Sequence, residues 1–248
     1  AREARRDDLI RVWYPNESTP YITSGTRTVD VAQVYANATP RYVVEYGQDP
    51  TDEDHYGRVV RETVGNPPDG PGGTWSFIYL IDDLPVAPFY DVDDPNTWIV
   101  SRTVVTDPNG NQSIYDFNPN GMAVRVEKFR TRQKLTVSGH PLPASYVTWR
   151  RYNNHNLPLL VIHPEGNSVE YEYDSGQVPG ISGTYVKRIG LLLRETHKPG
   201  NPYSLHAPTR PGSSGQTELT RRYVYEPIFS QQCAVIERRG NPIDHDGS

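Results

Sequence analysis

The sequence has one cysteine, one methionine and no long apolar run among its 248 residues. Cys233 cannot form a disulfide within the chain, and its apolar neighbours predict a small buried side chain rather than a nucleophile. No segment approaches the roughly 18 to 20 consecutive apolar residues that a membrane-spanning helix needs. The first residues also lack the apolar core of a signal peptide. The sequence therefore predicts neither an internal disulfide nor a membrane span.

An excess of positive charge is missing as well. The chain has 25 Lys and Arg residues against 30 Asp and Glu residues, a net charge of −5. Such a chain has no general attraction for a nucleic-acid backbone, so we expect no nucleic-acid partner. The seven histidines are scattered without zinc-like spacing, and the acidic stretches 49–54, 81–83 and 91–94 lack the calcium-loop pattern. We therefore predict solvated loops there, with no metal site and no cofactor.

Helical periodicity is rare, and only residues 1–12 could support a short helix. In its place the chain has 17 Tyr, 23 Pro and 20 Gly. Aromatic side chains suit a pleated sheet, while Pro and Gly interrupt it with turns. Composition therefore predicts an all-β fold with frequent turns and long irregular loops.

Period-2 alternation identifies three strands that share one pattern. In the segment 169–174, Val169, Tyr171 and Tyr173 fall on one face, while the acidic residues between them fall on the other. Two more segments place an aromatic pair on one face, namely 113–117 with Tyr115 and Phe117, and 220–226 with Tyr223 and Tyr225. The common pattern indicates one structural unit used several times.

The turns beside these strands also match. Asp107-Pro-Asn-Gly110 predicts a type I turn, because Asp can bond the backbone, Pro presets φ and Gly closes the turn. His163-Pro-Glu-Gly166 has Pro and Gly in the same places. The Gly of each turn lies seven residues before the second aromatic residue of the following strand. Gly121 and Asn156, two residue types that tolerate positive φ, end two further turns. The repeating unit is therefore strand, turn, strand, turn.

In order and spacing these segments resemble the YD repeats of Rhs (rearrangement hotspot) proteins. The resemblance is clearest over residues 100–242, with a degenerate repeat at 40–66, and we interpret residues 1–248 as a single YD-repeat region, a fragment of a longer shell. The sequence departs from the family pattern at Asn118 and Glu226, where the pattern has Asp. Such drift suits repeats that specify shape more than it suits a catalytic motif.

The resemblance implies antiparallel β-hairpin repeats in a continuous curved or spiralling sheet, the YD-repeat β-shell. In bacterial Rhs proteins and toxin-complex components the shell encloses a toxic C-terminal polypeptide, and in teneurins a similar shell supports adhesion. For this chain it implies a secreted or cell-surface location. The implied partners are neighbouring YD repeats of the same or a longer chain and an encapsulated toxin polypeptide.

Two other functions stay open at the level of sequence. Aromatic residues beside arginines, as in 148–152 and 221–225, could stack on sugars, which would make the chain an adhesion or carbohydrate-binding module with a cell-surface glycan as partner. A hydrolase hidden in the loops is the least favoured alternative, because Ser213 and Ser214 lack a nucleophile-elbow pattern. We therefore predict that the chain is not an enzyme and assign no catalytic, cofactor-binding or metal-binding residue.

Overall fold

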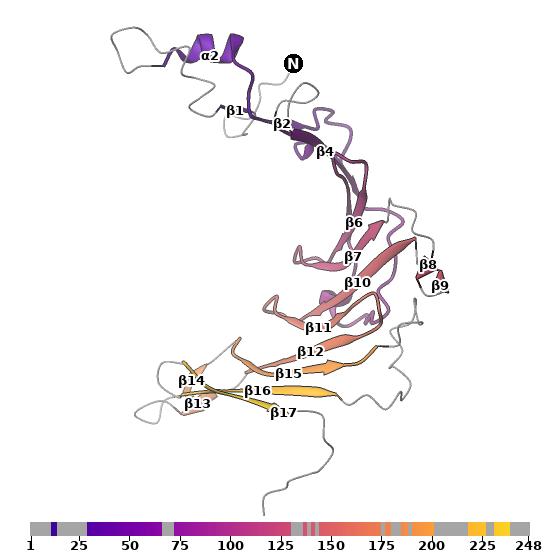
Figure 1. The fold of residues 1–248 in the computed structure, drawn as a ribbon, viewed down its shortest axis with the longest axis vertical. Helices are drawn as coiled ribbons and strands as arrows, with labels where there is room; N and C mark the ends of the chain where they lie inside the picture. The colour runs from indigo at the N-terminus through magenta and orange to yellow at the C-terminus, as the bar shows by residue number, and fades with distance from the viewer. Residues whose placement is uncertain are drawn as a thin grey trace, which may run out of the picture. The chain divides into compact units, whose positions relative to one another are not determined.

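The computed structural model describes residues 11–13, 29–65, 72–129, 136–137, 140–141, 144–174, 177–179, 185–187, 190–200, 218–226 and 231–238. The predicted all-β fold is confirmed. Thirteen antiparallel strands form one sheet (Figure 1). Its strands are β1 (Arg11–Val12), β2 (Tyr42–Tyr46), β3 (Val59–Gly65), β4 (Gly72–Leu80), β5 (Ser101–Thr106), β6 (Gln112–Phe117), β7 (Ala123–Phe129), β10 (Ser145–Tyr152), β11 (Pro158–Ile162), β12 (Ser168–Tyr173), β15 (Leu192–Lys198), β16 (Leu219–Tyr225) and β17 (Gln232–Arg238).

Strand order in this sheet follows chain order, so every strand pairs with the ones before and after it in the list. Two small hairpins lie outside the sheet: β8 (Thr136–Val137) with β9 (His140–Pro141), and β13 (Gln177–Pro179) with β14 (Tyr185–Lys187). Sequential pairing of this kind is what a chain of stacked hairpins produces.

Helical structure in the described residues is limited to α2 (Val31–Asn37) and the 3₁₀ turn η2 (Pro95–Thr97). Asp30 caps α2, because its side chain accepts a hydrogen bond from the backbone N–H of Gln33 at 3.1 Å. No pattern in the sequence predicts this helix. Of the segment expected to be helical, residues 1–10 lie outside the described residues and Arg11–Val12 is a strand. No helix in the described part of the chain is long and apolar enough to cross a membrane.

The chain divides into two compact units. The first comprises residues 1–84, 101–115 and 128–133, and the second comprises residues 85–100, 116–127 and 134–248. In the first, β2 to β5 pair in succession. In the second, β10 to β12 and β15 to β17 do the same.

The buried side chains of the second unit are as often polar as apolar. Its buried apolar residues among those described are Ala87, Val124, Val126, Tyr152, Ile162 and Val169. Its buried polar residues are Asn96, Thr97, Asp116, Asn118, Glu127 and Thr196. Because buried polar groups need partners, hydrogen bonds and ion pairs must contribute to holding this unit together.

The alternation predicted for β12 is confirmed. Val169 is buried, Tyr171 and Tyr173 are half-buried, and Glu170 and Glu172 are exposed. The expectation for Cys233 was wrong, because this residue is exposed on β17. Every described residue of β17 is exposed, and among the described strands β17 stands last in the sheet order, next to β16. Local sequence cannot show that position.

Candidate functional site

Four turns of the sheet share one backbone geometry. In 107–111, 118–122, 153–157 and 163–167, the N–H of the first residue donates to the carbonyl of the fifth, at 2.8 to 3.0 Å. The N–H of the fourth residue donates to the carbonyl of the first, at 2.9 Å in each turn. That fourth residue has a positive φ: 80° at Gly110, 74° at Gly121, 61° at Asn156 and 80° at Gly166. The turn predicted at 107–110 is thereby confirmed, and 163–166 forms a turn with the same hydrogen bonds, each ending in a left-handed residue that matches the strand twist.

The first side chain reinforces three of these turns. One oxygen of Asp107, Asn118 or Asn153 accepts hydrogen bonds from the backbone N–H groups of the third and fifth residues, at 2.8 to 3.1 Å. The Asn111 amide also donates to the Asp107 carboxylate, and this bond and the backbone ones lower the pKa of Asp107. The fourth turn begins with His163, which has no carboxylate or amide oxygen on its side chain.

A tyrosine marks a bulge at the end of four strands. The strand registers shift immediately before Tyr46, Tyr152, Tyr173 and Tyr225. The backbone N–H of the residue after each tyrosine then closes the following connection, at 2.8 to 3.0 Å. A tyrosine at a bulge, followed by a residue whose N–H closes the next connection, is therefore a repeated joint of this sheet. We call it the tyrosine joint.

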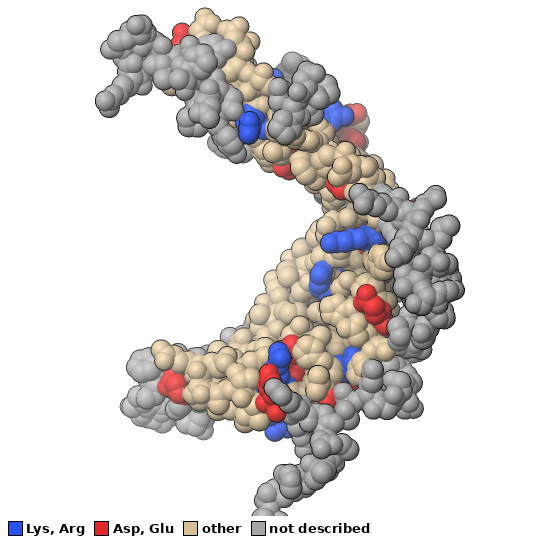
Figure 2. Space-filling view, viewed as in Figure 1, with Lys and Arg blue, Asp and Glu red and all other residues tan. Residues whose placement is uncertain are grey.

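Opposite charges face one another across neighbouring strands. Glu45 lies opposite Arg61, Glu172 opposite Arg194 and Arg221 opposite Glu237, and each pair is joined at 2.7 to 3.3 Å. On the face drawn in Figure 2, the described basic side chains are dispersed among acidic and uncharged ones. Such half-exposed pairs contribute little free energy each, but they favour this register over slipped ones.

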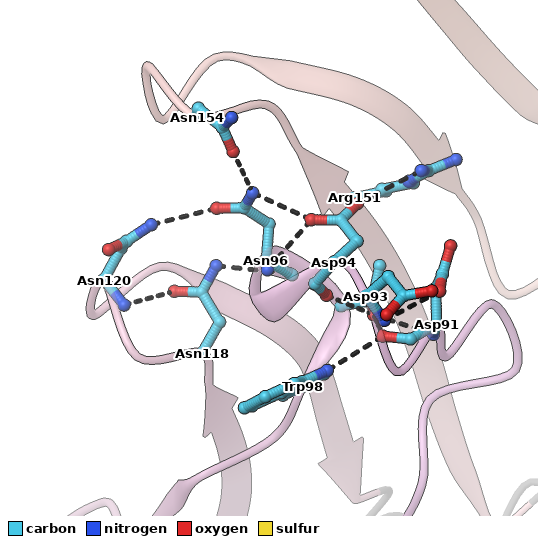
Figure 3. A network of polar contacts seen from close by, with 10 residues as sticks. Asp91, Asp93, Asp94, Asn96, Trp98, Asn118, Asn120, Arg151 and Asn154 are labelled. Carbon is cyan, nitrogen blue, oxygen red and sulfur yellow. Dashed lines mark hydrogen bonds and ion pairs between the residues drawn. The ribbon is translucent and has the colours of Figure 1, made fainter.

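A polar network fixes residues 85–100, which we call the clasp loop, within the second unit (Figure 3). At its centre Asn96 is only 3 % exposed. The Asn96 amide nitrogen donates to the side-chain oxygens of Asn154 at 2.6 Å and Asp94 at 2.9 Å, and its amide oxygen accepts from Asn120 at 2.9 Å. Asn118 donates to the Asn96 carbonyl at 3.3 Å. One side chain of η2 thus joins the turns 118–122 and 153–157.

The acidic stretch 91–94 takes part in this network. Asp94 accepts from Asn96 and pairs with Arg151 at 3.1 Å. Burial opposes ionisation of Asp94, but the hydrogen bonds from Asn96 and the Arg151 guanidinium outweigh it and lower its pKa. The carbonyl of Asp91 accepts from the Trp98 indole at 2.8 Å. These residues hold a loop in shape rather than forming an open carboxylate cluster.

An ion cluster lies nearby in the same unit. Asp116 is fully buried, and its carboxylate pairs with Arg125 at 3.0 Å. Arg125 also pairs with Glu127, whose other oxygen accepts from Ser145 at 2.5 Å. The guanidinium lies 5.6 Å from the centre of the Trp149 ring. The Arg125 guanidinium thus forms ion pairs with two largely buried carboxylates.

Two cavities of the second unit share lining residues from β11 and β12. The first, about 360 Å³, has a charged lining that includes Arg151, Glu170 and Arg194. The second, about 270 Å³, lies beside the rings of Tyr171 and Tyr173, which are nearly parallel with centres 6.5 Å apart.

No group of three His, Cys, Asp or Glu side chains is placed to hold a metal ion in the part of the chain described. The acidic stretch 49–54 instead holds its own loop. Asp49 accepts from the backbone and hydroxyl of Thr51, and Asp52 accepts from His55. Ser213 and Ser214 lie outside the described residues. Sequence reasoning missed Asn96, which lies two residues after the acidic stretch 91–94, and Asp116, which lies between Tyr115 and Phe117.

No protein-family model and no curated protein matches the sequence. Among solved structures, the crystal structure of TcdB2-TccC3-TEV matches with a TM-score of 0.35 and 14 % sequence identity. The alignment covers 81 % of this chain and 9 % of the TcdB2-TccC3-TEV chain. The present chain therefore spans less than a tenth of the length of that protein.

Proposed function

We propose that this chain is a non-enzymatic structural segment of an Rhs/YD-repeat protein, part of a β-shell that encloses or presents another polypeptide. The observation that carries the proposal is the tyrosine joint, which recurs at Tyr46, Tyr152, Tyr173 and Tyr225. A repeated joint adds one hairpin after another to the same sheet. In this proposal the chain extends by repetition of that joint.

The exposed apolar side chains support a polypeptide partner. Val86, Tyr90 and Val92 on the clasp loop are 70 %, 50 % and 65 % exposed. Apolar side chains grouped on one exposed segment are typical of a surface that another chain covers. The partners in this proposal are neighbouring YD repeats and an enclosed toxin polypeptide, with a secreted or cell-surface location.

Cryo-electron microscopy of the full polypeptide that contains this sequence tests the proposal. We expect the sheet to continue into further hairpins and to close around a lumen that holds polypeptide density. An open sheet with solvent on both faces would contradict it.

Protease protection gives a second test on the same polypeptide. An enclosed segment should survive trypsin at a concentration that degrades the same segment expressed without the sheet, and it should become sensitive once the sheet is unfolded. Equal digestion in both forms would speak against enclosure.

The carbohydrate-binding alternative has one observation in its favour, the paired rings of Tyr171 and Tyr173 beside a cavity. It does not compete with the shell, because a shell segment can also carry a binding site.

A further inference from the structure

We propose that Asn109 is a site of spontaneous modification, at which the side-chain amide condenses with the Gly110 nitrogen and converts through a cyclic imide to isoaspartate and aspartate. Glycine after asparagine favours this reaction, because glycine has no Cβ beside the attacking nitrogen. The sequence contains the pair twice, in Pro108-Asn-Gly110 and Pro119-Asn-Gly121. Each pair lies at the tip of one of the turns described above. The two copies differ in what holds the asparagine side chain.

The reaction consumes water and releases ammonia. The Gly110 nitrogen attacks Cγ of Asn109, so that a new C–N bond forms and the side-chain nitrogen leaves as ammonia with the proton that Gly110 has lost. Water then opens the imide at either carbonyl. Attack at the side-chain carbonyl gives aspartate, and attack at the backbone carbonyl gives isoaspartate, in which the chain continues through the side-chain carbonyl carbon. Either product adds a negative charge, and isoaspartate also adds a carbon atom to the backbone.

The backbone holds both glycine nitrogens in the same way. The N–H of Gly110 donates to the Asp107 carbonyl and that of Gly121 to the Asn118 carbonyl, each at 2.9 Å. A Cβ built at either glycine would meet no atom of the described residues within 4 Å, apart from the adjacent residues. In both turns the glycine N–H must therefore leave its carbonyl before its nitrogen can attack, through a local opening of the hairpin tip.

The asparagine side chains are held differently. Asn109 is exposed at the tip of the turn 107–111. The amide nitrogen of Asn120, which is the leaving group of the reaction, donates to the side-chain oxygen of Asn96 at 2.9 Å (Figure 3). Asn96 is buried at the centre of the polar network. Reaction at Asn120 therefore requires this bond to break in addition to the opening of its turn.

Modification at Asn109 disturbs a turn that a side chain reinforces. One carboxylate oxygen of Asp107 accepts from the backbone N–H groups of Asn109 and Asn111, both at 2.8 Å. Isoaspartate lengthens the chain between these two donors, so they no longer fit one oxygen. The product also places a negative charge close to the Asp107 carboxylate, and like charges repel. The reaction depends on the two turns alone, so it occurs whether or not the chain is part of a shell.

Peptide mapping by mass spectrometry tests the proposal on the whole chain, incubated in warm, mildly alkaline buffer. Fragment ions that separate isoaspartate from aspartate identify the product at each site. We expect Asn109 to convert roughly two- to tenfold faster than Asn120 in the folded chain, the factor that one net hydrogen bond corresponds to. In urea the two sites should convert at similar rates, because Pro precedes and Gly follows each asparagine. Comparing the folded chain with the unfolded one therefore isolates the effect of the fold.

Asn96→Ala separates the two sites. It removes the acceptor of the Asn120 amide, so conversion at Asn120 should rise by the same factor, whereas Asn109 should keep its rate. Asn37→Ala, which removes an exposed amide of α2, is the matched control and should change neither rate.

Circular dichroism establishes whether Asn96→Ala is folded, and the comparison of the parent chain with and without urea decides the matter if it is not. The proposal is overturned if Asn109 stays intact in the folded chain while it converts in urea. It is also overturned if Asn120 converts as fast as Asn109 in the folded chain, or if folded Asn96→Ala leaves the rate at Asn120 unchanged.

Discussion

The hydroxyl of Tyr152 donates a hydrogen bond to the carbonyl oxygen of Ala123 at 3.1 Å. Tyr152 ends β10 at a bulge, and Ala123 is the first residue of the neighbouring strand β7. Two further hydroxyls make the same contact with the first residue of a neighbouring strand: Tyr79 with Val59 at 2.7 Å, and Tyr225 with Leu192 at 2.9 Å. Because a backbone carbonyl at a strand end needs a hydrogen-bond partner, each tyrosine hydroxyl donates to a carbonyl where the regular strand pairing ends.

Tyr152→Phe removes the hydroxyl, with its bonds to Ala123 and Arg150, and keeps the ring. We expect the free energy of unfolding to fall by about 0.5 to 1.5 kcal/mol, the net value of one hydrogen bond. Thermal denaturation followed by circular dichroism measures it, with Tyr35→Phe on the exposed face of α2 as the control. Equal melting temperatures for the two variants would show that the hydroxyl bond does not contribute.

His163→Asn should stabilise the chain. The turn 163–167 has the backbone bonds of the turn 153–157 but lacks its side-chain oxygen. An Asn there can accept from two backbone N–H groups, for a gain of about 1 kcal/mol, or roughly 2 to 4 °C in melting temperature for a chain of this size. Asn153→His is the matched reverse change and should lower the melting temperature. A fall with His163→Asn would mean that the imidazole has a role that the backbone geometry does not reveal.

The parts of the fold that could be predicted are local in sequence. Asp107-Pro-Asn-Gly110 encodes its turn within four residues, and the segment 169–174 encodes its strand and faces by alternation. Neither prediction needed to know which strand lies next. The same holds for the all-β class, which follows from the supply of Tyr, Pro and Gly.

The parts that could not be predicted depend on distant residues. Asn96 meets Asn118 and Asn154, which lie 22 and 58 positions further along the chain. Asp116 alternates with two aromatic residues and reads as a solvent-facing position, yet Arg125 pairs with it in the interior. Cys233 shows the opposite error, since its apolar neighbours suggest burial and its place on the last strand exposes it.

Arg125→Met should destabilise the chain severely. It removes the guanidinium that pairs with the largely buried carboxylates of Asp116 and Glu127, and removing one partner of a buried pair costs roughly 3 to 5 kcal/mol. Arg151→Met is the matched control, because the Arg151 side chain, which pairs with Asp94, is 40 % exposed. We expect a loss of about 1 kcal/mol or less there. Urea denaturation compares the two, and similar midpoints would contradict the importance of burial.

Asn96→Ala should release the clasp loop without unfolding the sheet. The change removes the amide that joins the turns 118–122 and 153–157. Asn120 and Asn154 each lose their hydrogen bond to it, at a cost of about 1 to 3 kcal/mol. Hydrogen exchange should become faster in residues 85–100, while β15 and β16 keep their protection. Asn37→Ala, which removes an exposed amide of α2, is the control. Uniform loss of protection over the whole second unit would show that the loop is part of the core rather than a clasp on it.

Acid should open the clasp loop through Asp94. Its pKa in the folded chain lies below the ordinary value, because bonds from Asn96 and Arg151 outweigh the effect of burial. A carboxylate with a lowered pKa stabilises the fold at pH values above its unfolded pKa, and this stability is lost as pH falls through the folded pKa. The free energy of unfolding should therefore decline below about pH 4. The pKa of Asp107 is lowered too, so acid also reduces the global stability through that residue. Hydrogen exchange in residues 85–100 therefore reports on Asp94 better than global stability does. Asp94→Asn should exchange faster at neutral pH and lose most of the acid dependence in this loop. An unchanged acid response in that variant would assign the effect to another carboxylate.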